Sequence, residues 1–441
     1  MTKQLQRLRQ LSLRDMAVIG LPLLLLLGAA FWLASRFVGP APPRTLVLAS
    51  GGEGGAYQRF AAAYRDVLGR YDIELVEKPS AGAMENLRHL RDPAAEVDAA
   101  FFQAGIATPT EDDDLRSIGG LYHEPLWVFY RAALANPVEP DRLSLLKGRR
   151  IAIGAPGSGT HHLASELLRA NGVDAKNTKL VETGGLALAE AFARGSIDAA
   201  FVVGPTQSAT VWTLLYTPGV RLMNLAHADA YTRLFPYLSK LTLPQGAVDL
   251  VRNIPSRDVD LLAPVATILV RDDMHPALID LLMQAAAEVH GVPGIFQRPG
   301  EFPQAMAVDF PLSRESERFY RSGRPFLQRY LPFWAATLID RMVVLLIPFF
   351  ALLLPLFKIA PSLYSWRVRS RIYRRYGELK FLEAEVEREP ERHPRNEWLA
   401  KLEEIERDVN RIPTPLAYAD MLYTLRVHIE LVRATMLRKT A

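Results

Sequence analysis

The chain has 441 residues, of which 49% are hydrophobic, so it is long enough to form two or three compact units. A formal net charge of +4 is small for this length, and we expect no nucleic-acid partner. Cysteine is absent, which excludes disulfides, thiolate chemistry and cysteine-based metal sites, and which suits a protein of the periplasm.

The first element in the chain is an uncharged apolar run, Met16–Ser35, which would be about 30 Å long as a helix and could cross a bilayer. Four basic residues precede it: Lys3, Arg7, Arg9 and Arg14. Basic residues mark the cytoplasmic side of a span, so residues 1–15 are expected in the cytoplasm. A cleaved signal peptide is the alternative, but its apolar core is usually about 7–15 residues long. The sequence therefore favours a transmembrane helix over residues 16–38.

An internal duplication follows this helix. Residues 44–103 are expected to form a strand, a glycine loop, a helix, a strand, a helix and a strand, and residues 149–204 repeat that order. The copies end in "VDAAFF" and "IDAAFV", which place Asp98 and Asp198 a hundred positions apart. Alternating strands and helices predict parallel sheets with right-handed crossovers. We expect an α/β domain of two lobes with a cleft between them, and chance likeness between two generic α/β units is the alternative.

Each copy carries its glycine loop between its first strand and its first helix. The loops read "GGEGGAYQRF" from residue 51 and "GAPGSGT" from residue 154. A helix start offers free N–H groups and the positive end of the helix dipole, and glycine lets the backbone approach a ligand. In the second loop, Ser158 and Thr160 add hydroxyl groups. Two such loops facing one cleft predict a clamp for a small anion, unless they are merely tight turns.

Catalytic and metal chemistry have less support. Residues 156–160 read Pro-Gly-Ser-Gly-Thr, which is no nucleophile elbow, and the loop lacks the lysine of a phosphate-binding loop. His161 and His162 are neighbours whose side chains would point about 100° apart on a helix. We expect no catalytic residue, no cofactor and no bound metal.

Six blocks in this segment occur in a characteristic order: "GGEGGAYQRF", "SAGAMENLRHL", "VDAAFFQAGIA", "LYHEPLWVFYR", "LKGRRIAIGAPGSGT" and "IDAAFVVGPT". Over about residues 44–290, their order and spacing resemble those of the TAXI-type solute receptors of TRAP transporters. The resemblance implies a type II periplasmic-binding-protein fold, in which two α/β lobes on a hinge close over the solute. It also implies a small carboxylate as ligand, such as glutamate or 2-oxoglutarate.

The resemblance assigns the ligand contacts to matching positions in this chain. These are Ser50, Gly51, Gly52, Gly55, Ala56, Tyr57, Ser80, Gln103, Ser158, Gly159, Thr160, Gly204 and Thr206. Glu53 departs from the family pattern, which usually has threonine or serine there. A carboxylate at this helix start would repel an anionic solute. Glu53 therefore faces solvent, pairs with a cationic group of the ligand, or marks an occluded cleft.

A second apolar run, Met342–Phe357, continues past Lys358 and predicts a transmembrane helix over residues 338–362, with kinks at Pro348 and Pro355. A basic cluster follows: Arg367, Arg369, Arg371, Arg374 and Arg375. This cluster marks the cytoplasmic side. Both termini are then cytoplasmic, and the main domain is periplasmic at a bacterial inner membrane.

The predicted periplasmic domain spans residues 40–335. Its first lobe is expected over about 44–125 and 225–330, and its second over about 126–224. The cytoplasmic tail, 366–441, reads as charged amphipathic helices that form a hairpin or a coiled-coil-like module. The tail either stabilises the membrane-proximal region or docks a cytoplasmic partner.

The apolar runs predict a membrane-anchored protein, and the resemblance implies a receptor that binds a small carboxylate or amino acid and delivers it to TRAP membrane subunits. The alternative is a sensor or scaffold that couples the same fold to a cytoplasmic or membrane partner. Two spans and a helical tail are more than solute capture alone requires.

Overall fold

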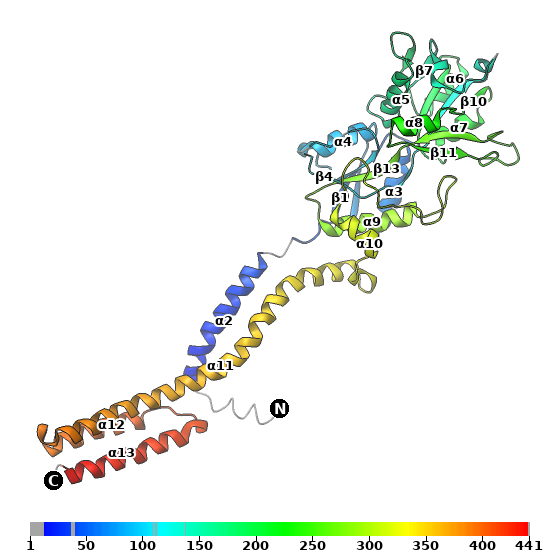
Figure 1. Cartoon of the computed structure of the whole chain (residues 1–441). Coiled ribbons are helices and arrows are strands. Elements are labelled where there is room, and N and C mark those ends of the chain that lie inside the picture. Colours follow the sequence, from blue (N-terminus) through cyan, green and yellow to red (C-terminus); the bar gives the residue numbers. More distant parts are fainter. Residues whose placement is uncertain (1–12, 37–39, 108, 111–112, 137, 440–441) are drawn as a thin grey trace. The chain divides into compact units, whose positions relative to one another are not determined.

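The computed structural model of the chain describes residues 13–36, 40–107, 109–110, 113–136 and 138–439 (Figure 1). It divides into two compact units, which are described separately. A two-sheet unit comprises Ala41–Thr337, and a helical unit comprises Met1–Pro40 together with Leu338–Ala441. The basic residues Lys3, Arg7 and Arg9, on which the topology prediction rests in part, lie outside the described residues.

The first half of the duplication has the predicted order of elements. It consists of β1 (Thr45–Ala49), α3 (Ala56–Gly69), β2 (Glu74–Lys78), α4 (Ala83–Arg91) and β3 (Ala99–Gln103). Strand β1 pairs in parallel with both β2 and β3. Helix α3 forms because its apolar residues recur three and four positions apart, and it buries that face on the sheet.

The second half repeats this arrangement. It consists of β7 (Arg150–Ala152), α5 (Gly159–Ala170), β8 (Lys179–Val181), α6 (Ala187–Ala193) and β9 (Ala199–Val203). Strand β7 pairs in parallel with β8 and with β9. The two halves therefore share both the order of their elements and their strand pairing.

An aspartate at the matching position of each half forms hydrogen bonds with the backbone of the central strand, and we call these hydrogen bonds the strand clamp. The N–H of Val47 in β1 donates to Asp98 Oδ2 at 2.8 Å, and the N–H of Arg150 in β7 donates to Asp198 Oδ2 at 2.9 Å. The N–H of each aspartate donates in return to the carbonyl of the same strand residue, at 3.1 Å and 2.8 Å. The contacts coincide position by position, so the two halves are structurally equivalent at this strand.

The first sheet is mixed, whereas the sequence analysis expected a parallel sheet. Its order is β2-β1-β3-β13-β4, where β13 (Val265–Arg271) runs antiparallel to β3 and to β4 (Leu115–Ser117). The short β5 (Tyr122–His123) also pairs antiparallel with β13. Strand β13 has this direction because it enters the sheet from the other lobe rather than by a helical crossover.

The second sheet has the order β11-β12-β6-β9-β7-β8, and β10 (Val220–Leu222) pairs with β6 (Leu126–Arg131). Strands β11 (Ser239–Leu243) and β12 (Val259–Ala263) form an antiparallel pair within this sheet. The second lobe thus extends to Ala263. The sequence analysis placed the return to the first lobe at about residue 225, because this antiparallel pair lacks the strand–helix alternation of the duplication.

Two adjacent connections join the lobes. The chain leaves the first sheet after β5 through Glu124 and Pro125, and it returns between β12 and β13 through Pro264. The N–H of Glu124 donates to the carbonyl of Pro264 at 2.9 Å. We call residues 124–125 and 264 the hinge. Among the described residues up to Arg271, no other segment of the chain passes from one sheet to the other.

Three helices complete the covering of the sheets. Helices α7 (Ala209–Tyr216) and α8 (Ala228–Leu234) pack on the second sheet, and α9 (Pro276–His290) packs on the first beside α3. The buried side of α9 contributes nearly every apolar residue between Ala277 and Ala286 to the core of the first lobe.

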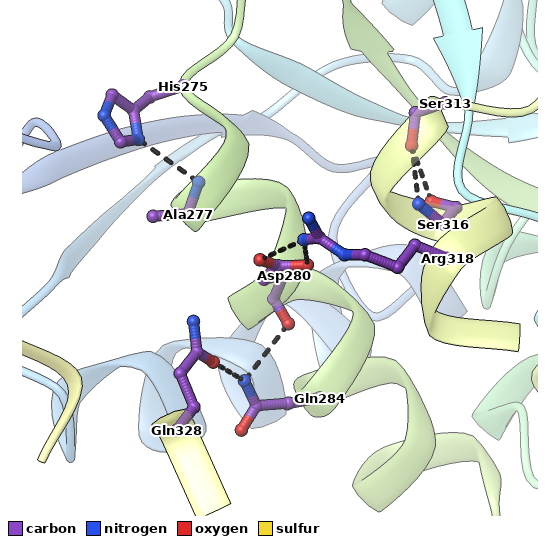
Figure 2. A network of polar contacts seen from close by, with 8 residues as sticks. All are labelled: His275, Ala277, Asp280, Gln284, Ser313, Ser316, Arg318 and Gln328. Carbon is purple, nitrogen blue, oxygen red and sulfur yellow. Dashed lines mark hydrogen bonds and ion pairs between the residues drawn. The ribbon is translucent and has the colours of Figure 1, made fainter. Parts of the chain in front are cut away.

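A segment after α9 is bound to the first lobe by polar contacts (Figure 2). In α10 (Arg314–Ser322), the Arg318 guanidinium donates to both carboxylate oxygens of Asp280, at 2.8 Å and 2.7 Å. The Gln284 amide donates to Gln328 Oε1 at 2.8 Å. Phe333 is buried in the same core. Residues 313–337 are therefore docked on the first lobe.

The helical unit contains α2 (Leu13–Ser35), α12 (Arg395–Asn410), α13 (Ala419–Lys439) and most of α11 (Phe333–Arg388). Helix α11 continues through Pro348 and Pro355 and past residue 366, where the sequence analysis began a separate tail. The end of α11 packs with α12 and α13 around a core that includes Leu382, Trp398 and Ile429.

Within the described residues, α11 is long and apolar enough to cross a membrane, judged by length and composition. The apolar part of α2 in that set, Gly20–Ser35, is shorter. A second span at α2 therefore stays a prediction.

Candidate functional site

A cavity of about 330 Å³ lies between the two lobes. Both glycine loops line it, together with the first residues of α3, α4 and α5. The ends of β3 and β9 and the hinge residue Glu124 complete the wall. The cavity thus lies at the carboxyl ends of parallel strands, where open α/β sheets place their ligands.

Most of the residues that the sequence analysis assigned to the ligand line this cavity. They are Gly51, Gly52, Gly55, Ala56, Tyr57, Gln103, Ser158, Gly159, Thr160 and Gly204, and Glu53 lies among them. The duplicated loops are therefore brought together in one site, although they are a hundred residues apart in the chain.

Ser50, Ser80 and Thr206 are not brought to the cavity wall. The buried Ser50 hydroxyl donates to Glu77 Oε1 at 2.8 Å, and the Ser80 hydroxyl donates to Asn86 Oδ1 at 2.6 Å. Both serines support the first loop from behind. Thr206 lines a separate cavity of about 230 Å³.

The first loop leaves the start of α3 open. Gly54 has φ +70°, a left-handed conformation that favours glycine, and its N–H donates to Gln58 Oε1 at 2.8 Å. The N-cap position of α3, Gly55, supplies no side-chain hydrogen bond. The first-turn N–H groups have no partner within the helix, so a ligand can take them. Glu53 is exposed at the rim, as the solvent-facing alternative requires.

The second loop differs because its two hydroxyls also make hydrogen bonds within the fold. Ser158 caps α5 by accepting from the N–H of His161 at 3.2 Å, and its own hydroxyl donates to the Ala155 carbonyl at 2.6 Å. Thr160 Oγ1 accepts from the N–H of Val203 at 3.1 Å. The sequence analysis treated these hydroxyls as ligand donors. The Ser158 hydroxyl donates within the loop instead, whereas the Thr160 hydroxyl and the backbone N–H groups at the start of α5 can still donate to a ligand.

The lobes approach each other closely at the cavity. A Cβ atom on Gly159 would lie 2.2 Å from Gln103 Oε1, and one on Gly82 would lie 3.2 Å from the Ser158 Cα. Real Cβ atoms essentially never come within 3.0 Å of another heavy atom. A side chain on Gly159 would therefore displace the terminal amide of Gln103 on the other lobe.

Two polar contacts also cross between the lobes. His162 Nε2 lies 3.1 Å from the Gly105 carbonyl oxygen, and Arg59 Nη1 donates to the Gln207 carbonyl at 2.8 Å. The sequence analysis weighed His162 as a metal ligand. In the structure, this histidine connects the start of α5 to the loop after β3.

Glu124 is the wall residue that the sequence analysis missed. Its side chain is buried, with 3% of the residue exposed, yet it lines the cavity. Its Oε2 accepts from the Tyr57 hydroxyl and its Oε1 from the Tyr122 hydroxyl, each at 3.0 Å. Burial raises the pKa of Glu124 to about 7, against the opposing effect of the two tyrosine hydrogen bonds. An acid within the apolar block "LYHEPLWVFY" was the available signal for a buried carboxyl group.

The charge of the wall is negative. Among the residues that the structure describes there, Glu53 and Glu124 carry carboxylates, and no lysine, arginine or histidine is present. A ligand anion would therefore be held by backbone N–H groups and helix dipoles rather than by a basic side chain. A ligand cation would find an acceptor in Glu124.

A model of the NMT1-like family matches residues 48–290, more than half of the chain. Solved structures are similar at low identity. The aliphatic sulphonate binding protein SsuA from Escherichia coli is 15% identical, with 69% of this chain and 84% of that chain covered and a TM-score of 0.35. The regulatory domain of CcmR from Synechocystis, in complex with 2-PG, is 16% identical, with 56% and 97% covered and a TM-score of 0.38. The BenM effector binding domain with benzoate is 15% identical, with 60% and 100% covered and a TM-score of 0.37.

Proposed function

Because the chain belongs to the NMT1-like family, with a periplasmic-binding-protein-like type II solute-binding domain, we propose that it is a membrane-anchored extracytoplasmic receptor for a small carboxylate. The observation that carries this proposal is the cavity between the lobes, into which both glycine loops and three helix starts face. Helix starts favour a carboxylate. A volume of about 330 Å³ suits a molecule of the size of glutamate or 2-oxoglutarate.

The delivery route and location belong to the same proposal. Helix α11 anchors the receptor at a bacterial inner membrane, and α2 forms a second anchor, with residues 40–335 in the periplasm and both termini in the cytoplasm. The apolar composition of α11 supports a membrane span, and the basic residues beside both apolar runs support the orientation. The captured solute passes to TRAP membrane subunits, as the resemblance to TAXI-type receptors implies. The receptor performs no catalysis.

A thermal-shift screen on the full chain in lipid nanodiscs tests the receptor proposal. Glutamate or 2-oxoglutarate should raise the unfolding temperature of the chain, whereas a neutral sugar should not. Gly159→Val should abolish the shift, because its side chain would meet Gln103 across the cavity. Gly69→Val is the matched control, since a Cβ on Gly69 meets no atom within 4 Å and its backbone, like that of Gly159, has no positive φ. If no small carboxylate or amino acid shifts the wild-type chain, the proposal is wrong.

One observation favours the sensor as a second candidate function. The segment 313–337 is held on the first lobe by the Asp280–Arg318 pair (Figure 2). Helix α11 starts in this segment and continues into the helical unit. A receptor that only captures solute has no need of such a docked connection. A sensor needs one, because a change in the lobe must reach the tail.

Hydrogen exchange of α12 and α13 in the full chain, with and without glutamate, distinguishes the two functions. A sensor should change the exchange of these helices on binding, and Arg318→Ala should remove that change. Arg321→Ala is the matched control, because Arg321 makes a surface pair with Glu317 on the same helix. A tail whose exchange is unaffected by bound solute would contradict the sensor function.

A further inference from the structure

The acidic residues of the cavity wall would oppose the binding of a plain dicarboxylate, and the proposed function does not explain how such a ligand binds. A plain dicarboxylate would bring negative charge to a wall that holds Glu53 and Glu124 and, in its described residues, no basic side chain. Glu53 is exposed at the rim, where solvent screens its charge. Glu124 is buried, so solvent does not screen its carboxylate. The charge state of Glu124 must therefore match the ligand.

The geometry around Glu124 leaves room for one further partner. Each carboxylate oxygen accepts one tyrosine hydroxyl, from Tyr57 on α3 and from Tyr122 on β5. A carboxylate oxygen can accept two hydrogen bonds, so each retains one acceptor position. Both tyrosines lie on the first lobe, and Glu124 reaches the cavity from the hinge. A solute group that donates hydrogen bonds can complete this shell.

Two further titratable groups pack beside this cluster: Tyr64 on α3, whose pKa burial raises, and His290 on α9. The His290 ring stacks on Tyr122, with centroids 5.1 Å apart. Burial lowers the pKa of His290 to about 3, so this imidazole stays neutral and supplies no counter-charge. Burial also raises the pKa of Tyr57 and of Tyr122, so they remain protonated donors. Among the described residues that touch the Glu124 carboxyl group, none is cationic, so a cation that pairs with its ionised form comes from the solute.

We infer that Glu124 is a specificity-determining residue that gives up its proton to solvent and binds the ammonium group of the solute. This inference rests on the proposed receptor function and narrows its solute to an amino acid. The backbone N–H groups at the helix starts take the solute carboxylate, and Glu124 takes its ammonium. The carboxyl group becomes a carboxylate on binding, and its proton passes to the buffer.

The inference predicts the sign of proton exchange. A pKa of about 7 leaves Glu124 partly protonated at neutral pH. L-glutamate should therefore bind with release of about half a proton at pH 7. A plain dicarboxylate such as 2-oxoglutarate requires the protonated acid, so it should bind more weakly and with proton uptake.

Titration calorimetry of the full chain, in two buffers of different ionisation enthalpy, measures this exchange. We expect L-glutamate to bind at least tenfold more tightly than 2-oxoglutarate, with proton release. Glu124→Gln should abolish the proton release and should reduce the preference for L-glutamate over 2-oxoglutarate by at least tenfold. Glu190→Gln is the matched control and should change neither, because that carboxylate makes an exposed pair with Arg194 outside the cavity.

Tyr122→Phe keeps the inference testable if Glu124→Gln does not fold. It removes one hydrogen bond to the ionised carboxylate, which raises the pKa of Glu124 further, so proton release on binding glutamate should increase. Tighter binding of 2-oxoglutarate than of glutamate, or proton uptake with glutamate, would overturn the inference and leave the receptor function intact. Failure of every small carboxylate and amino acid to bind would overturn the receptor function itself.

Discussion

The two halves of the duplication use the same strand clamp in opposite electrostatic settings. Asp98 and Asp198 accept equivalent backbone hydrogen bonds. Arg150 binds both carboxylate oxygens of Asp198, at 2.6 Å and 3.0 Å, and holds the pKa of that carboxyl below its usual value. Burial instead raises the pKa of Asp98. Both copies thus have an aspartate oxygen that accepts from the strand N–H, whereas the charges around the two aspartates differ.

The ligand-facing parts of the two halves diverge further. The second half caps its helix with Ser158, whereas the first half leaves the start of α3 without a side-chain cap. The buried carboxyl of Glu124 is bound by tyrosines of the first lobe alone. Duplication therefore supplies the frame of the cavity, and the first lobe with the hinge supplies its selectivity.

The largest effect should come from the pH dependence of stability that Glu124 causes. Its pKa rises from 4.5 to about 7 on folding, so the stabilising contribution is complete below pH 4.5 and is lost as the pH rises through 7. The loss amounts to about 3 kcal/mol in the free energy of unfolding. Denaturation of wild type and Glu124→Gln from pH 5 to 8 measures it. An equal decline in both chains would contradict the buried site, and comparison of the chains cancels the opposing contribution of His290.

Asp198→Ala should have the next largest effect, about 2.5 kcal/mol, because it leaves a backbone N–H and the Arg150 guanidinium without their acceptor. Hydrogen exchange of β7 should accelerate, while exchange of β1 stays as in wild type. Arg194→Ala is a control from the same lobe, since Arg194 makes an exposed pair with Glu190. Equal acceleration of hydrogen exchange in β1 and β7 would mean that the two aspartates do not stabilise their strands independently.

Asp98→Ala should cost less, about 1.5 kcal/mol, because it removes the acceptor for the Val47 N–H without breaking a bidentate ion pair. Exchange of β1 should accelerate, and exchange of β7 should not. A cost equal to or above that of Asp198→Ala would contradict the view that Arg150 adds stability only in the second half.

Glu53→Thr should have the smallest effect. Because Glu53 is exposed at the rim, the affinity for glutamate and for 2-oxoglutarate should change less than about threefold. Calorimetry on both solutes measures this. A selective loss of glutamate binding would move the ammonium site from Glu124 to Glu53.

The repeated parts of the fold could be predicted from the sequence. The glycine loops, the apolar spacing of the helices and the paired aspartates are local patterns, and they predicted the order of elements in both halves. The antiparallel β11–β12 pair was not predicted, because strand pairing without a helical crossover leaves no such alternation. That omission placed the lobe boundary near residue 225 rather than after Ala263.

Only part of the site could be predicted from the sequence, for a physical reason. The loop glycines could be placed because strand-to-helix turns mark them. The roles of Ser50, Ser158 and Glu124 depend on partners distant in sequence or on caps, such as the contact between Tyr57 and Glu124, which are 67 positions apart. Single-sequence patterns do not encode such tertiary contacts.

The central claim is that a small solute binds between the lobes, and the distance between the lobes tests it most directly. The chain has no cysteine, so spin labels at Asp66→Cys on α3 and Arg169→Cys on α5, both exposed, report one distance without background labelling. With full-length protein in nanodiscs, L-glutamate should narrow the distance distribution measured by electron double resonance toward its shorter values, and Gly159→Val should abolish the change. A distribution that saturating glutamate and 2-oxoglutarate leave identical to that of the free protein would contradict the account.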